Sequence, residues 1–220
     1  MNVLMVEDHR LVADAMQVWL REIDPDINVT TCYSTQHALT VADSGECFDL
    51  VLTDLLMPGI DGLGLLVGLR NRNVSAPVII VSGSDDDRYI RAAMDQGAAG
   101  FIPKTLPGAE MIASIKRVLA GEPCFPDRFT NNGNETSNPA DGYSVNRGDM
   151  PSKKQLQVLQ LMAEGHSNKQ ISQIVGISEA TVKYHTSQLF KLFGVKNRTS
   201  CVREAQRRGL LRGYESNGVT

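Results

Sequence analysis

The chain has 220 residues, of which 42% are hydrophobic and 21% charged. This composition is typical of a globular protein of one or two domains, each able to bury its own core. No apolar stretch approaches the roughly 20 residues that span a bilayer. We expect no signal peptide, because the first residues turn acidic without a basic region. The four cysteines lack metal-ligand spacing, so we expect reduced thiols and a cytoplasmic location.

The net charge of −3 conceals two halves of opposite sign. Residues 1–150 carry 11 Lys and Arg against 21 Asp and Glu, a formal charge of −10. Residues 151–220 carry 11 Lys and Arg against 4 Glu, a formal charge of +7. This separation indicates one part that handles cations and another that meets a polyanion.

In the acidic half, short apolar runs alternate with segments of helical periodicity. The predicted strands are 3–6, 27–32, 51–54, 77–82 and 100–104. Each is followed by a predicted helix, over 11–23, 34–42, 63–69, 89–97 and 112–121. Such alternation predicts an α/β fold: a five-stranded parallel sheet, doubly wound and flavodoxin-like, with strand order 2-1-3-4-5.

In this order the first and third strands are neighbours, and the crevice between their carboxyl ends is where ligands bind. The first strand ends in Glu7 and Asp8, and the third ends in Asp54. The same edge receives Ser82 from the fourth strand and Lys104 from the fifth. Phosphoryl transfer needs carboxylates that bind Mg2+, a hydroxyl and one ammonium group. Asp54 would be the nucleophile.

Each of these residues also has a plainer interpretation. Asp54 and Ser82 could each cap the helix that follows, because Asp and Ser are residue types that often do so after a strand. Glu7 and Asp8 are ordinary polar residues for a strand end, and Lys104 for a solvated loop. Their joint position at the ends of four strands favours the functional interpretation.

Residues 1–121 resemble a response-regulator receiver domain. The matching residues are the acidic pair, the phospho-acceptor, the Ser/Thr switch residue, the switch aromatic and the lysine, here Glu7, Asp8, Asp54, Ser82, Phe101 and Lys104. Another class of phosphotransferase has a second Asp two positions after the nucleophile, where this chain has Leu56. The difference argues against a turnover phosphatase and for a stable phosphorylated state.

The resemblance implies that Mg2+ is bound by Asp8, Asp54 and the main-chain carbonyl of Leu56, with Glu7 assisting through water. It also implies that a histidine kinase supplies the phosphoryl group. Phosphorylation would then draw Ser82 towards the phosphoryl group and let Phe101 turn inward. That change would alter the face formed by the fourth predicted helix, the fifth strand and the last helix of this half.

Residues 122–150 are rich in Gly, Asn, Pro and Ser and have little periodicity. We interpret them as a flexible linker, in which Phe125, Phe129 and Tyr143 are candidates to dock on a domain surface.

The basic half predicts short helices. Ser152 and Gln155 form a capping box, and a second helix over 168–175 precedes a turn at Gly176. A third helix begins after Ser178, runs to about residue 192 and stops at Gly194. Two helices joined by a glycine-containing turn indicate a helix-turn-helix. One side of the third helix has no acid and carries groups able to read a major groove: Ala180, Lys183, Tyr184, Ser187 and Lys191.

Residues 150–212 resemble the LuxR-type helix-turn-helix of the NarL/FixJ subfamily, through the stretches 165–171, 176–185 and 192–198. The resemblance implies that the 178–192 helix enters the major groove of double-stranded DNA and that dimers bind two half-sites. The candidate DNA contacts are Lys169, Thr181, Lys183, Tyr184, Ser187, Lys191, Asn197 and Arg198. Gln155 and Gln157 stand where the family often has acids, and Tyr184 where a small aliphatic residue is common.

We therefore predict a receiver domain over 1–121, a linker over 122–150, a four-helix DNA-binding domain over 151–213 and a tail over 214–220. The leading hypothesis is a two-component transcription regulator, not an enzyme, in which phosphorylation relieves a contact between the halves and promotes a homodimer. The alternative is a protein-binding adaptor that uses the face around Phe101. A metal-dependent enzyme ranks last, because the sequence supplies neither a substrate pocket nor a general acid.

Overall fold

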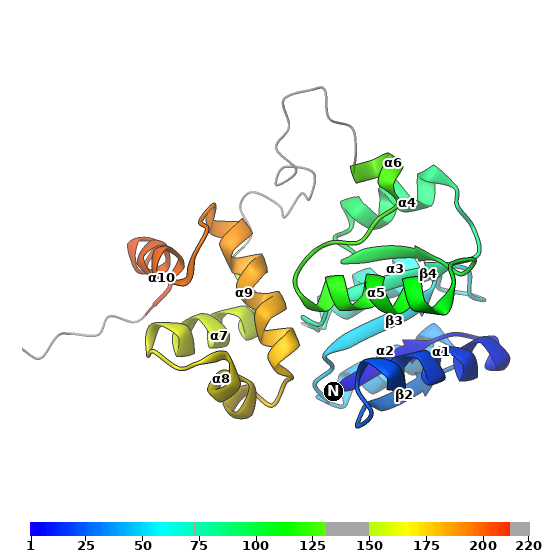
Figure 1. The fold of residues 1–220 in the computed structure, drawn as a ribbon, viewed down its shortest axis with the longest axis horizontal. Helices are drawn as coiled ribbons and strands as arrows, with labels where there is room; N and C mark the ends of the chain where they lie inside the picture. Colours follow the sequence, from blue (N-terminus) through cyan, green and yellow to red (C-terminus); the bar gives the residue numbers. More distant parts are fainter. Residues whose placement is uncertain (73, 131–149, 212–220) are drawn as a thin grey trace, which may run out of the picture.

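The computed structural model describes residues 1–72, 74–130 and 150–211. An α/β receiver body forms the N-terminal part, and four helices gather on one side of it (Figure 1). Within the described ranges, no helix combines the length and the apolar character needed to cross a membrane.

The sheet has the predicted order β2-β1-β3-β4-β5, and every neighbouring pair is parallel. Its strands are β1 (Asn2–Val6), β2 (Asn28–Cys32), β3 (Leu50–Asp54), β4 (Val78–Ser82) and β5 (Gly100–Pro103). The prediction of fold and strand order is confirmed.

Helices cover both faces of the sheet, which explains why the central strands β1, β3 and β4 are apolar over most of their length. One face is covered by α1 (Arg10–Ile23) and α5 (Gly108–Leu119). The other is covered by α2 (Thr35–Asp43), α3 (Gly62–Asn71) and α4 (Asp87–Asp95). Side chains alternate along each strand, so that in β1 Val3 and Met5 face the first group and Leu4 and Val6 the second.

The segment after α5 fastens onto the receiver. Cys124 pairs with the outer edge of β5, where its carbonyl accepts a hydrogen bond from the Phe101 amide at 2.8 Å. Phe125 is buried in the core on the α2–α4 face, and Phe129 of α6 (Asp127–Thr130) packs against that core. Phe125 and Phe129 therefore dock as expected, and Tyr143 lies outside the described residues.

The predicted limits of the linker and the tail stay a prediction. Residues 131–149 and 212–220 lie outside the described ranges, and residues 122–130 pack on the receiver with Cys124 and Phe125 buried.

The C-terminal helices are α7 (Lys153–Ala163), α8 (Asn168–Val175), α9 (Glu179–Phe193) and α10 (Arg198–Arg207). The predicted capping box at Ser152 and Gln155 is present, and a second one joins Ser167 and Gln170 at the start of α8. Gly176, with φ of 72°, ends α8 in the left-handed conformation and makes the turn into α9. These helices bury a core of their own, to which α9 contributes Val182, Leu189 and Phe193.

Truncation of Phe125 tests how firmly the 122–130 segment is attached. We expect Phe125→Ala to destabilise the receiver by about 3–5 kcal/mol, because a large side chain leaves a packed core. Arg128→Ala, which removes an exposed ion pair with Asp87, should cost below about 1 kcal/mol. Urea unfolding of the full chain measures both, and equal costs for the two variants would contradict the assigned role of Phe125.

Candidate functional site

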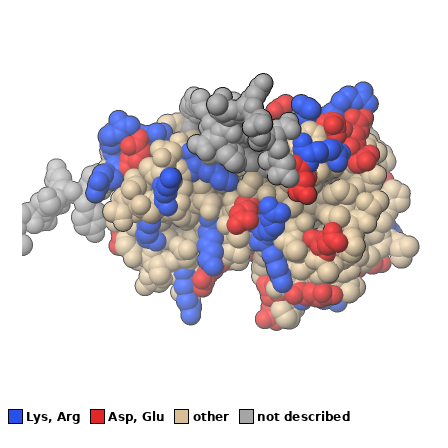
Figure 2. Space-filling view, turned by 45° about the horizontal axis from the view of Figure 1, so that its top comes forward, with Lys and Arg blue, Asp and Glu red and all other residues tan. Residues whose placement is uncertain are grey.

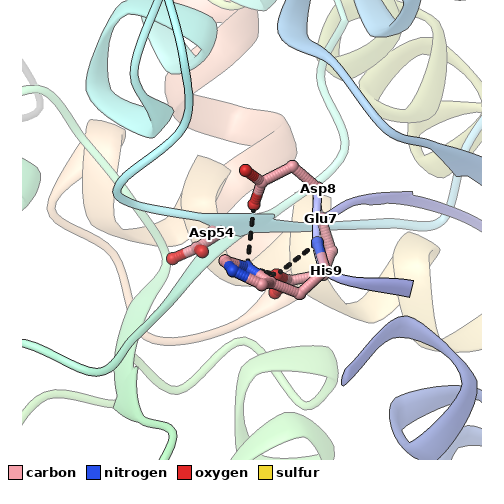
Figure 3. Close-up of side chains that lie close together, drawn as sticks. All are labelled: Glu7, Asp8, His9 and Asp54. Carbon is pink, nitrogen blue, oxygen red and sulfur yellow. Dashed lines mark hydrogen bonds and ion pairs between the residues drawn. The ribbon is translucent and has the colours of Figure 1, made fainter. Parts of the chain in front are cut away.

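Three carboxylates converge at the C-terminal ends of β1 and β3 (Figure 3). Glu7 and Asp8 directly follow β1, and Asp54 is the last residue of β3. Because β1 and β3 are adjacent, residues separated by 46 positions in the sequence meet. Together with His9, these residues bring possible ligand atoms within 4.8 Å of one another. The predicted acidic crevice is thus present.

Lys104 follows β5 and reaches the same crevice. Its Nζ lies 2.8 Å from Asp54 Oδ2 and 2.7 Å from Glu7 Oε2. Asp54 is 5% exposed and Glu7 1% exposed. Burial opposes the charge of the ammonium group, but the hydrogen bonds to Asp54 and Glu7 outweigh it, so the pKa of Lys104 is raised. The lysine is therefore a fixed positive charge beside the acceptor oxygens.

The crevice fits a hard divalent cation. Three carboxylates face one lysine, so negative charge remains in excess at neutral pH. Asp8 Oδ1 lies 3.0 Å from His9 Nδ1, yet it is buried without a hydrogen bond to any described residue. The amide of Leu56 donates to Asp54 Oδ1 at 3.3 Å, which brings the main chain of Leu56 to the crevice. An all-oxygen donor set with an unsatisfied carboxylate oxygen is of the kind that Mg2+ prefers.

The plainer interpretation of Asp54 and Ser82 as helix caps does not hold. Asp61 caps α3, where its side chain accepts from the Gly64 amide, and Asp86 caps α4. The Ser82 hydroxyl instead accepts from the Ser84 amide at 3.0 Å and is buried beside the crevice.

Phe101 differs from the expectation of a ring that turns inward on phosphorylation. Its side chain is already inward, 1% exposed in the core on the α2–α4 face. Phe125 belongs to the same core, and Cys124 holds the β5 edge beside it. The chain's own segment thus covers part of the face that the adaptor hypothesis assigns to a partner.

The side of α9 predicted to read DNA lies against the receiver. Ala180 and Tyr184 pack on the core beneath α1 and α5, and burial raises the pKa of the Tyr184 hydroxyl to about 12. Ser187 meets the backbone at Gly121 so closely that a Cβ there would lie 2.5 Å from its Oγ. Lys191 Nζ donates to the Gly121 carbonyl at 3.3 Å.

Of the other candidate DNA contacts, Thr181 is fully buried and donates to Asp49, and the remaining four divide into two groups. Lys169 and Lys183 are exposed. Asn197 caps α10 by accepting from the Ser200 amide. The guanidinium of Arg198 donates to the carbonyls of Met162 and His166, and its pKa is lowered by burial. Asn197 and Arg198 therefore have structural roles here.

Sequence reasoning missed two residues. His9 stands next to the acidic pair, which was the available signal. Asp49 precedes β3 and contacts the start of α9, 129 residues away, which no local pattern reveals. Figure 2 shows the charge separation: Lys and Arg dominate the surface of the helical domain, and most Asp and Glu lie over the receiver.

Two protein families match the chain. Residues 3–116 match the family described as response regulator receiver domain, and residues 151–205 match the luxR family of bacterial regulatory proteins.

Relatives match both parts together. The chain is 33% identical to the glycerol metabolism activator of Pseudomonas putida over 208 residues, covering 93% of this chain and 94% of that protein. It is 31% identical to the nitrate/nitrite response regulator protein NarP of Escherichia coli (strain K12), covering 90% and 91%. A solved LuxR family DNA-binding response regulator from Silicibacter pomeroyi has a TM-score of 0.50 at 29% identity, covering 57% of this chain and 96% of that one.

His185 on α9 predicts a dependence of stability on pH. It is 1% exposed, and burial lowers its pKa to about 4. The positive charge of Lys154 also lowers this pKa, and the negative charge of Asp49 raises it by less. An unfolded histidine takes up its proton near pH 6.5, so stability is full above that pH and is lost as pH falls towards 4. We expect a loss of about 2 kcal/mol between pH 7 and 5 from this group. Urea unfolding of the full chain between pH 7 and 5 should show a smaller loss of unfolding free energy in His185→Gln than in wild type. An equal pH dependence of the unfolding free energy in the two proteins would contradict the prediction.

Proposed function

The chain belongs to the response regulators that carry a LuxR-type DNA-binding domain, and we propose that Asp54 is its phospho-acceptor and switches DNA binding by α9. The observation that carries this proposal is the placement of α9. Its predicted reading side lies on a receiver whose crevice holds an acidic acceptor beside a charged lysine. A chain that holds both a phospho-acceptor and a DNA-reading helix covered by the receiver can couple phosphorylation to DNA binding.

In the proposed reaction, an Asp54 carboxylate oxygen attacks the phosphorus of a phosphohistidine on a histidine kinase. The new P–O bond makes an acyl phosphate, and the P–N bond breaks to return the kinase histidine. Asp8, Asp54 and the Leu56 carbonyl would hold Mg2+, with Glu7 acting through water, and the ion when bound supplies charge neutralisation. Lys104 stabilises the phosphoryl oxygens as its bond to Asp54 loosens.

Two side chains connect this chemistry to the receiver surface. The Ser82 hydroxyl would leave the Ser84 amide for a phosphoryl oxygen. Phe101, inward in this structure, would stay inward, so the change is expected in the α4 and β5 segments that follow Ser82 rather than in the ring.

DNA recognition is proposed for α9. A helix enters the major groove with one side towards the bases, and this side of α9 is packed on the receiver. Binding therefore requires the receiver to separate from α9. We propose a homodimer on two half-sites, with Lys183, Tyr184 and Ser187 towards the bases and Lys169, Thr181 and Lys191 towards the backbone. We propose residues 1–121 and 151–213 as the limits of the two domains.

The acceptor is tested with beryllofluoride, which mimics an acyl phosphate. We expect wild type with Mg2+ and beryllofluoride to gain about tenfold or more in affinity for a duplex selected from a random pool. Asp54→Asn should gain nothing, because the acceptor carboxylate is lost. Fluorescence anisotropy at fixed salt measures both. An identical gain in the two proteins would place the switch elsewhere.

A change at Gly121 should open the closed arrangement without chemistry at Asp54. Gly121 has φ of 86°, and its missing Cβ leaves room for Ser187. Gly121→Ala adds backbone strain and a steric clash, so we expect DNA affinity without beryllofluoride to rise about tenfold.

Gly45 is the matched control, because its φ is 80° but its Cβ would meet nothing within 4 Å. Gly45→Ala should leave DNA affinity as in wild type. Equal affinities of the two variants would contradict the masking of α9.

A further inference from the structure

We infer that the N-terminal end of α9 is a binding site for one phosphate of the DNA backbone, and that the carboxylate of Asp49 occupies this site in the closed arrangement. The inference rests on the proposed function and adds a ligand position and a competing residue to it.

The site consists of two donors and one buried acceptor. Asp49 Oδ1 accepts from the Ser178 amide at 2.7 Å and from the Thr181 hydroxyl at 2.8 Å. Its Oδ2 accepts from the Asn2 amide at 2.7 Å, which ties the carboxylate to the start of β1. Asp49 is 4% exposed and Thr181 fully buried. The carboxylate is therefore held rigidly between the two domains.

The donors are those that bind phosphate in other contexts. α9 has 15 residues, so its N-terminus carries the full partial positive charge of a helix dipole. Main-chain amides and hydroxyls at the start of a helix are frequent contacts to DNA phosphates. An anion already lies at this place in the structure, since the Asp49 carboxylate is bound there by both donors.

The environment of Asp49 supports the role of a stand-in anion. None of the ion pairs between described residues includes Asp49, so its buried charge is balanced by hydrogen bonds and the helix end. Burying a carboxylate is costly without such partners. A phosphate would be stabilised at this place by the same groups.

Occupation by Asp49 and by DNA is mutually exclusive. The Ser178 amide has one hydrogen to donate, and a phosphate oxygen needs the position of Asp49 Oδ1. The receiver and DNA therefore compete for the same donors, and each lowers the affinity of the other by the same factor.

The first test removes the competing charge in the full chain. In Asp49→Asn the carbonyl oxygen can still accept from Asn2, but the amide group then turns donor hydrogens towards Ser178 and Thr181. We expect DNA affinity without beryllofluoride to rise about tenfold and to equal that of wild type with it. Asp26→Asn, an exposed site with the same change of charge, should match wild type in both conditions.

The second test concerns the phosphate itself. With beryllofluoride, Thr181→Val should bind DNA several-fold more weakly at fixed salt, and the slope of log affinity against log salt should stay as in wild type, because a neutral hydroxyl releases no counterion. A series of duplexes with a single neutral methylphosphonate at each backbone position then locates the contact. At one position the methylphosphonate should lower the DNA affinity of wild type but cause no further loss of affinity in Thr181→Val.

The outcomes separate the two levels of proposal. If wild type responds to beryllofluoride but Asp49→Asn does not differ from it, this inference is wrong and the proposed function stands. If Asp49→Asn gains affinity while no methylphosphonate position couples to Thr181, Asp49 only joins the domains and the phosphate site is wrong. If no protein binds a selected duplex in any condition, the proposed function itself fails.

Discussion

Under the proposed function one surface of α9 has two competing uses, and this constraint relates the remaining features of the molecule to one another. Tyr184 is partly buried and packs against the receiver, Ser187 lies on Gly121, and the helix start is bound by Asp49. A helix cannot offer the same side to a protein core and to a groove in DNA. The acidic receiver and the basic helical domain therefore form a closed pair whose opening is the event that any input must bring about.

Asp54 and the contact with α9 lie at opposite ends of β3. Asp54 ends the strand, and Asp49 directly precedes its start, so roughly 16 Å of extended backbone separates them. β3 is buried throughout and paired with a strand on each side, so a bend of β3 would disrupt its packing and its pairing. The elements around β5 are better suited, because Lys104 leads into α5 and α5 leads to Gly121 under Ser187. Loss of the Lys104–Asp54 bond would act at one end of this path, and the α9 contact lies at the other.

The fold and the crevice could be predicted because each depends on local patterns. Apolar runs mark the strands, and parallel order alone brings Glu7, Asp8 and Asp54 together. Contacts across long separations leave no such pattern, so Asp49 at α9 was missed. The helix α6 has four residues, too few for a period to show. Asn197 and Arg198 have side chains suited to phosphates and to helix ends alike, and only their hydrogen bonds in the structure distinguish the two.

The composition of the closed contact also bounds how strong it can be. A switch from about 1% to about 99% open needs a change of about 5.5 kcal/mol, and a closed state that is 99% populated is more stable than the open state by about half of that value. Among the described residues, the polar part of the contact includes the bonds that Asp49 accepts and a bond from Lys191 to the Gly121 carbonyl, and Tyr184 packs beside them. A phosphate offered by DNA replaces the Asp49 bonds one for one, so DNA itself supplies part of the free energy of opening. The receiver then needs to weaken the packing of α9 and the bond from Lys191 to Gly121.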